Sequence, residues 1–159
     1  MSTSTTEAPA EASLKALGLD YRVVRHGRVS SLAEAAAARG VSPAQIIKTL
    51  VVRRGEDDFL FVLVPGDREI SWPKLRALLG VNRISMPAAA TALAVTGYER
   101  GTITPFGSSR AWPVFADARI GPGEVSLGAG EHGAAVQVDA SAALVALEAT
   151  VADLTEPLG

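Results

Sequence analysis

One lysine stands in an otherwise apolar, β-branched stretch of the chain. Residues 46–54 are rich in valine, isoleucine and leucine, which favours a strand, and Lys48 lies near its start. Side chains alternate between the two faces of a strand, so Lys48 shares the more apolar face with Leu50 and Val52. An ammonium buried without a partner is costly, which favours a lysine that lines a polar cavity. A lysine at a sheet edge that extends its ammonium into solvent fits the same periodicity.

Two glycine-containing segments are the next candidates for chemistry. Residues 97–107 hold three glycines and Pro105, and residues 128–133 hold three more glycines. Glycines let backbone amides approach a ligand closely and can direct N–H groups at an oxyanion. Neither segment has the spacing of a P-loop or of a dinucleotide-binding fingerprint, so an ordinary turn remains an alternative for both.

The two histidines of the chain, His26 and His132, could each act as a base or bind a phosphate, and each could equally be a solvated surface residue. They do not have the spacing of a metal-binding pair. The chain has no cysteine, which excludes disulfides and thiolate ligands. We therefore expect neither a metal nor a cofactor.

The composition is that of a globular protein. With 159 residues, 48% of them hydrophobic, the chain can bury one core, and we expect a disordered tail over residues 1–10 and a single domain over residues 11–159. The net charge of -2 argues against a surface that binds nucleic acid everywhere, but Arg22, Arg25 and Arg28 could form a local basic patch. The polar N-terminus does not resemble a signal peptide, and the apolar runs are too short to cross a bilayer, so we expect a cytoplasmic protein with no membrane partner.

Capping and turn residues predict the elements that must position these groups. Ser31 and Glu34 have the spacing of a capping box, and Gly40 is placed to end that helix. Helices are expected over residues 7–17, 31–39, 71–79, 87–95 and 141–149, with one further helical turn from residue 42. Strands are expected over residues 21–24, 46–54, 58–64, 83–85, 112–117, 124–127 and 134–138. The fully apolar run 59–64 should be central in its sheet. The pattern predicts an α+β (mixed α/β) fold, with a mixed sheet packed or curled against several helices.

Taken together, four motifs resemble the YbaK/EbsC-like aminoacyl-tRNA deacylases, relatives of the editing domain of prolyl-tRNA synthetase. The motifs are the segment Gln45-Ile46-Ile47-Lys48-Thr49-Leu50, the turn Pro65-Gly66-Asp67, the Gly101-x-x-x-Pro105-Phe106-Gly107 loop and Gly128-Ala129-Gly130. The resemblance runs in order from about residue 14 to residue 154. It implies a YbaK-like fold with a curved, mostly antiparallel sheet. It also implies a trans-editing hydrolase that deacylates mischarged aminoacyl-tRNA, with the 3′ end of that tRNA and an aminoacyl-tRNA synthetase as expected partners.

The resemblance also assigns roles to residues. Lys48 and Gly101 match the family's catalytic positions. There the lysine is expected to hold the terminal adenosine or its phosphate and to stabilise developing charge, and the Gly101 loop positions the scissile carbonyl. Substrate binding is implied for the residues around these motifs, which are His26, Thr49, Thr104, Pro105, Phe106, Gly128, Gly130 and His132.

Two departures from the family pattern fall near the amino-acid pocket. His26 stands where cysteine-specific members commonly have tyrosine, and Ala135 stands where they have aspartate. The cognate amino acid is therefore not predicted, and neither is the oligomeric state. A binding module of the same fold, which recognises a tRNA end, a nucleotide or a protein without hydrolysis, is the alternative hypothesis. A hydrolase of some other activated aminoacyl ester is a third.

Overall fold

The computed structural model describes residues 8–158. Its helices are α1 (Pro9–Ala16), α2 (Leu32–Arg39), α3 (Trp72–Leu79), α4 (Ala89–Thr96), α5 (Ala140–Ala146) and the single 3-10 turn η1 (Pro43–Gln45). Its strands are β1 (Tyr21–Arg25), β2 (Ile47–Gly55), β3 (Asp58–Pro65), β4 (Arg68–Ile70), β5 (Val114–Asp117), β6 (Glu124–Gly128), β7 (Ala134–Asp139), β8 (Thr150–Ala152) and β9 (Thr155–Pro157). Most of the expected tail, residues 1–10, lies outside the described residues. Pro9 and Ala10 do not extend that tail, because they form the first turn of α1 and Ala10 is buried.

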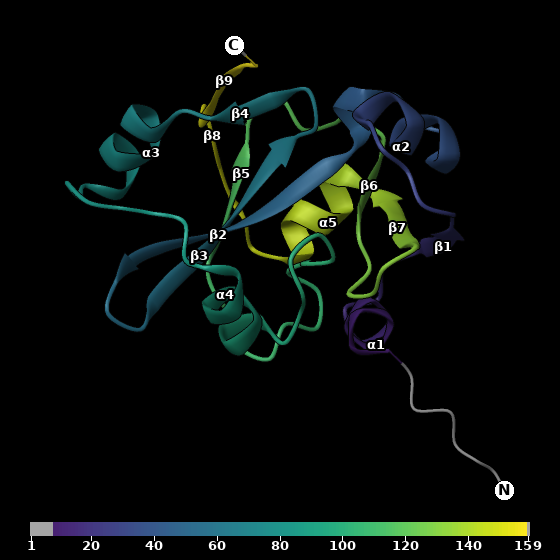
Figure 1. Ribbon diagram of the computed structural model, residues 1–159, viewed down its shortest axis with the longest axis horizontal. Coiled ribbons are helices and arrows are strands. Elements are labelled where there is room, and N and C mark those ends of the chain that lie inside the picture. The colour runs from purple at the N-terminus through teal and green to yellow at the C-terminus, as the bar shows by residue number, and fades with distance from the viewer. Residues whose placement is uncertain (1–7, 159) are drawn as a thin grey trace, which may run out of the picture.

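The strands form three sheets (Figure 1). A four-stranded sheet has the order β2-β3-β5-β8, a three-stranded sheet has the order β1-β7-β6, and β4 pairs with β9. The β3–β5 and β5–β8 pairs are parallel, and the other pairs are antiparallel. The expected α+β fold with a mostly antiparallel mixed sheet is confirmed. The expected central position of the apolar strand β3 is confirmed as well.

Strand β2 lies at the edge of its sheet, and on its open side isolated bridges form only near its two ends. Just before it begins, Ile46 forms an isolated parallel bridge with Ser126, which joins the four-stranded sheet to β6. Toward its other end, Arg53 and Ser85 exchange two backbone hydrogen bonds of 2.7 and 3.1 Å. The strand expected over residues 83–85 is reduced to this one bridge. A single bridge is too short to extend into a ladder, and the central part of β2 keeps an open edge.

Side-chain caps or glycines set the ends of several helices, as the sequence predicts. Ser31 accepts a hydrogen bond from the backbone N–H of Glu34 at 3.1 Å, and Gly40 ends α2 in the left-handed conformation with φ 70°. Asp139 caps α5 in the same way by accepting from the N–H of Ala142. Within residues 8–158, no helix combines the length and apolar character that crossing a membrane requires.

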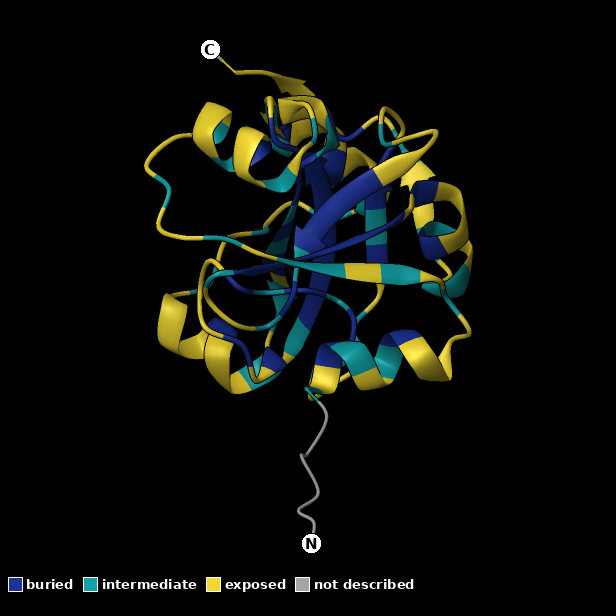
Figure 2. Ribbon diagram, turned by 90° about the vertical axis from the view of Figure 1, so that its right-hand side faces the viewer, coloured by how far each residue is buried: buried dark blue, intermediate teal, exposed yellow. Residues whose placement is uncertain are grey.

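Two apolar clusters lie on opposite faces of the β2–β3 hairpin. Ile47 and Phe61 belong to the larger cluster, which also contains Leu14 of α1 and Phe106. The smaller cluster is built around Val62 on the other face, with residues of α3. Figure 2 shows the buried strands running through the centre and the exposed outer faces of the helices around them. The hairpin is thus anchored on both faces, which fixes the position of its open edge.

Candidate functional site

A cavity of about 480 Å³ lies along the open edge of β2, and we call it the lysine chamber. Its floor is the β2 segment around Lys48 and Thr49, and its walls come from the start of α4 and from the loop at Gly101. The full lining is Arg39, Ile46, Ile47, Lys48, Thr49, Leu50, Val51, Met86, Pro87, Ala89, Ala92, Arg100, Gly101, Ile103 and Gly128. The chamber exists because the sheet ends at β2 and no further strand covers that edge.

Lys48 is partly buried on this strand, on the face that carries the smaller apolar cluster. Its Nζ donates a hydrogen bond to the backbone carbonyl oxygen of Arg68 at 2.6 Å. Burial lowers the pKa of Lys48, and the nearby charges of Glu69 and Asp67 oppose that shift. The lysine thus combines the two sequence-based alternatives, because it lies on an edge strand and also lines a cavity.

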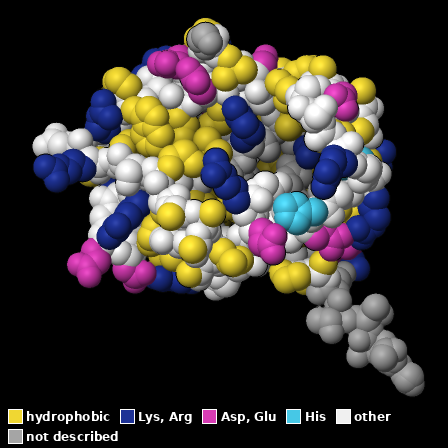
Figure 3. Space-filling model, in the orientation of Figure 1, with side chains coloured by type: hydrophobic (Ala, Val, Ile, Leu, Met, Phe, Trp, Pro, Cys, Tyr) yellow, Lys and Arg dark blue, Asp and Glu magenta, His cyan; other side chains and the backbone are white. Residues whose placement is uncertain are grey.

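The charged residues that line the lysine chamber, within the described part of the chain, have one sign. Three of its lining residues, Arg39, Lys48 and Arg100, are cationic, and none of its lining residues is an aspartate or glutamate. Figure 3 shows Lys and Arg side chains around an apolar hollow on this face of the molecule. A cleft lined by one sign of charge concentrates ligands of the opposite sign. The chamber is therefore suited to an anionic ligand that also has an apolar part.

A second, more open cavity of about 650 Å³ adjoins the first, and we call it the histidine chamber. Its lining is His26, Gly27, Arg28, Val29, Arg39, Gly101, Glu131, His132, Gly133 and Ala134. Arg39 and Gly101 line both cavities, so the two chambers meet at these residues. The two chambers therefore lie next to each other, with Arg39 and Gly101 at their border.

The two histidines occupy different environments within this chamber. His132 is exposed, and its Nε2 lies 3.0 Å from a carboxylate oxygen of Glu99. The Nδ1 of His26 lies 2.9 Å from the carbonyl oxygen of Gly27, whereas its Nε2 is buried without a hydrogen-bond partner. Among the described residues, no group of three or more histidine, aspartate or glutamate side chains is arranged to hold a metal ion.

The two glycine loops pack against each other at the chamber wall. Gly101 has φ 90°, a conformation that favours glycine, and the space where its Cβ would lie is empty. A Cβ on Gly128 would lie 2.7 Å from the carbonyl oxygen of Ile103, so only glycine allows this approach of β6 to the loop. The backbone N–H of Gly130 donates to the carbonyl of Thr102 at 2.9 Å. Each loop therefore holds the other in place.

The structure brings some of the predicted site residues together and leaves others apart. Lys48, Thr49, Gly101 and Gly128 line the lysine chamber, and the hydroxyl of Thr49 is buried there without a hydrogen-bond partner. His26 and His132 line the histidine chamber. The remaining predicted residues line neither chamber, and they are Thr104, Pro105, Phe106 and Gly130.

Two of the predicted residues outside the chambers, Thr104 and Phe106, anchor the 97–107 loop in the protein interior. Thr104 and Phe106 are fully buried, and Phe106 is part of the larger apolar cluster. Tyr98 donates a hydrogen bond to the carbonyl oxygen of Phe106 at 2.7 Å, and burial raises the pKa of Tyr98 to about 12. Arg39, in contrast, lines both chambers but was not predicted from the sequence.

Fold and site together define a small α+β domain with a cationic, two-part cleft bordered by glycine loops. The chain belongs to the aminoacyl-tRNA editing domain family, whose model matches residues 26–144. The resemblance to the YbaK/EbsC-like proteins is confirmed. The matched range contains every lining residue of both chambers, which run from His26, its first position, to Ala134.

Some similar proteins are much longer than this chain, and others match it over most of their own length. A "Proline--tRNA ligase" of Bacillus licheniformis is 32% identical over 115 residues, which are 72% of this chain but only 19% of the ligase. The Enterococcus faecalis protein named "Putative Cys-tRNA(Pro)/Cys-tRNA(Cys) deacylase EbsC" is 26% identical over 82% of this chain and 78% of its own length. A solved structure described as a "putative trans-editing enzyme for prolyl tRNA synthetase" has a TM-score of 0.84 and 26% identity. That match covers 96% of this chain and 99% of the other.

Proposed function

We propose that this protein hydrolyses the ester bond of a mischarged aminoacyl-tRNA, and that it acts in trans. The observation that carries the proposal is the lysine chamber, whose described lining combines Lys48, Arg39 and Arg100 with Gly101 and contains no acidic residue. The 3′ end of a tRNA is a polyanion with an apolar base and an acyl group, which suits this lining. The trans mode is supported by the match, over nearly its whole length, to a structure described as a trans-editing enzyme.

The proposed chemistry asks little of protein side chains. An aminoacyl ester is already activated, so positioning and stabilisation of developing charge supply most of the catalysis. Water adds to the ester carbonyl, the tetrahedral oxyanion collapses, and the bond to the ribose oxygen breaks. The products are the free amino acid and the tRNA hydroxyl, which takes up the proton that the water lost. Lys48 and the amides of the Gly101 loop stabilise the oxyanion, and a neighbouring ribose hydroxyl or the amino acid's own amino group orients the water.

A panel of mischarged tRNAs tests this proposal. It includes proline tRNA charged with several wrong amino acids, because ligases that act on proline are among the relatives. We expect the protein to deacylate at least one member and Lys48→Ala to lose that activity while remaining folded. Lys15→Ala serves as the matched control, since Lys15 is an exposed residue of α1 outside both chambers. Full activity of Lys48→Ala would remove the lysine from the mechanism.

A binding module without hydrolysis is the second candidate, and one observation favours it. The lysine chamber has no carboxylate or histidine that could act as a general base. No turnover on any member of the panel, together with saturable binding of tRNA or adenosine, would establish this alternative. Turnover of an aminoacyl ester that carries no tRNA would instead indicate a broader esterase.

A further inference from the structure

Arg39 occupies the place where the two chambers meet. It is the last residue of α2, and it lines both cavities. Among the described residues only Gly101 shares this position, and glycine has no side chain to offer a ligand. A ligand that extends from one chamber into the other would therefore pass close to Arg39.

Buried polar groups of the three-stranded sheet hold Arg39 in this position. Gln137 of β7 is 1% exposed and donates a hydrogen bond from its side-chain amide to the backbone carbonyl of Arg39. Ser126 of β6 is fully buried, and its hydroxyl accepts a hydrogen bond from Nη1 of Arg39 at 3.4 Å. Both the main chain and the side chain of Arg39 are thus fixed from beneath, as expected of a preorganised contact.

The positive charge of Arg39 has no carboxylate partner in the part of the chain that the structure describes. The acidic groups nearest to the histidine chamber are already engaged, because Glu131 pairs with Arg25 and Glu99 pairs with His132. The Nε of Arg39 is buried without an acceptor, and burial lowers the pKa of the guanidinium. A partly buried cation without a counter-charge is costly to a fold, so its presence favours a role with a ligand.

We propose that Arg39 is a specificity-determining residue that binds an oxyanion of the ligand at the junction of the chambers. This inference rests on the proposed function. Two parts of an aminoacyl-tRNA end could supply the oxyanion, namely the 5′-phosphate of the terminal nucleotide and a carboxylate in the side chain of the attached amino acid. A guanidinium recognises both through charge-assisted hydrogen bonds, and lysine cannot reproduce its planar fork.

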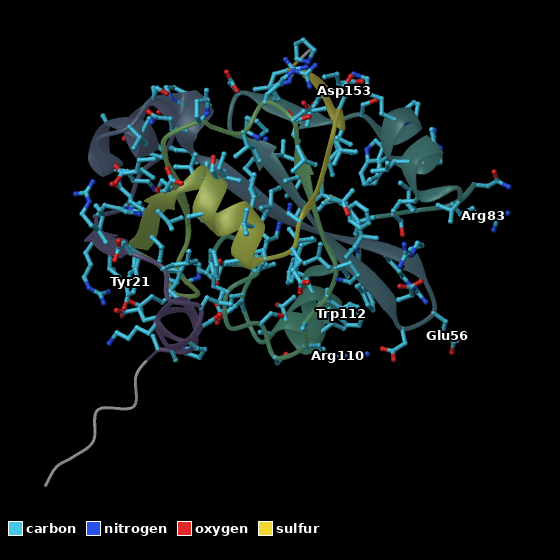
Figure 4. All side chains as sticks on the ribbon, turned by 180° about the vertical axis from the view of Figure 1, so that it is seen from behind. Tyr21, Glu56, Arg83, Arg110, Trp112 and Asp153 are labelled. Atoms are coloured by element: carbon cyan, nitrogen blue, oxygen red, sulfur yellow. The ribbon has the colours of Figure 1, made fainter. Side chains whose placement is uncertain are left out.

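The phosphate source is tested by binding alone. Dissociation constants of adenosine 5′-monophosphate and of adenosine are measured by calorimetry for the wild type, Arg39→Gln and Arg39→Lys. We expect Arg39→Gln to weaken binding of the monophosphate about 10- to 100-fold, as for the loss of one or two hydrogen bonds to a charged group, and to leave adenosine unchanged. Arg83→Gln is the matched control, because it removes the same charge from an exposed residue that lines neither chamber and projects from the surface (Figure 4).

The carboxylate source is tested by turnover. The rates of deacylation of one tRNA charged with glutamate and with glutamine are compared in the same variants, and this source predicts a selective fall of kcat/KM for glutamate in Arg39→Gln. The inference is overturned if Arg39→Gln matches Arg83→Gln in both tests while the wild type binds the nucleotide or deacylates the panel. If the wild type does neither, the proposed function fails and this inference fails with it. Thermal unfolding of each variant confirms that it is folded.

Discussion

The ammonium of Lys48 is hydrogen-bonded to the backbone carbonyl oxygen of Arg68, at 2.6 Å. The acceptor is a neutral group at the start of β4, so the contact orients the lysine without neutralising its charge. A lysine paired with a carboxylate would offer much less potential to an anionic ligand. The contact with Arg68 therefore keeps Lys48 both positioned and available.

We expect the rate of deacylation to fall at high pH as Lys48 loses its proton. Burial lowers the pKa of Lys48 below its usual 10.5, and the charged form is the one that stabilises an oxyanion. The fall should thus begin at a lower pH than for an exposed lysine. Rates of the wild type are measured against pH, and those of Lys48→Ala are subtracted to remove the spontaneous hydrolysis of the ester. A difference that stays constant beyond pH 10.5 would contradict an ionised Lys48 in the reaction.

Gly128→Ala should destabilise the protein and reduce its activity together. The new Cβ would lie 2.7 Å from the carbonyl oxygen of Ile103 and 2.9 Å from that of Thr102, and backbone atoms cannot move aside as a side chain can. We expect a loss of about 1–3 kcal/mol in the free energy of unfolding, as for other overpacked sites. Urea unfolding measures it. Gly55→Ala is the control, because the atom nearest to the position of its Cβ lies 3.8 Å away and Gly55 lines neither chamber.

Arg39→Met should stabilise the protein while it weakens binding of anions. The substitution removes a partly buried, uncompensated charge and keeps most of the apolar volume, so we expect a gain of about 0.5–2 kcal/mol in the free energy of unfolding. Arg83→Met should leave stability within about 0.5 kcal/mol of the wild type, as is usual for surface positions. A loss of stability in Arg39→Met would show that the hydrogen bond to Ser126 outweighs the cost of burying the charge.

Tyr98 should make stability depend on pH above its usual pKa of 10. Its pKa in the folded protein is raised to about 12 by burial, so between these values the unfolded chain loses the proton first. The unfolded state then binds fewer protons than the folded state, and stability falls as pH rises through this window. Denaturant unfolding from pH 8 upward measures the fall, which Tyr98→Phe should lack.

The same substitution should lower stability at neutral pH as well. Tyr98→Phe leaves the carbonyl of Phe106 without its donor, at a cost of about 1–3 kcal/mol. Tyr21→Phe provides the comparison, since the hydroxyl of Tyr21 donates to the carboxylate of Glu11 at 3.1 Å in a less buried setting. Equal losses in the two variants would argue against a special role for the buried hydroxyl.

Elements governed by local signals could be predicted from the sequence. The helices bounded by Ser31 and Gly40, and by Ser71 and Gly80, begin and end where their caps indicate. The strands β4, β8 and β9 were not predicted, because each has three residues and depends on partners far away in the sequence. Strand β4, for example, pairs with β9 through Ile70 and Thr155.

The candidate site was predictable where a residue type contradicted its surroundings. Lys48 is conspicuous in an apolar strand, and the glycine loops are conspicuous by composition. Arg39 carries no such signal, because a basic residue in the last turn of a helix is ordinary and complements the helix dipole. Its importance arises only when Ser126 and Gln137, from distant strands, place it between two cavities.

The open edge of β2 has a consequence for solubility as well as for ligands. Arg53 directs its amide and carbonyl away from β3, toward Ser85, and the alternation of an antiparallel ladder directs those of Thr49 and Val51 the same way. Such unpaired groups are normally a template on which another chain can add a strand and begin to aggregate. Here the start of α4 and the loop at Gly101 lie across the cavity from that edge. These two segments obstruct the approach of a second polypeptide strand to the edge of β2 and leave a cavity beside it.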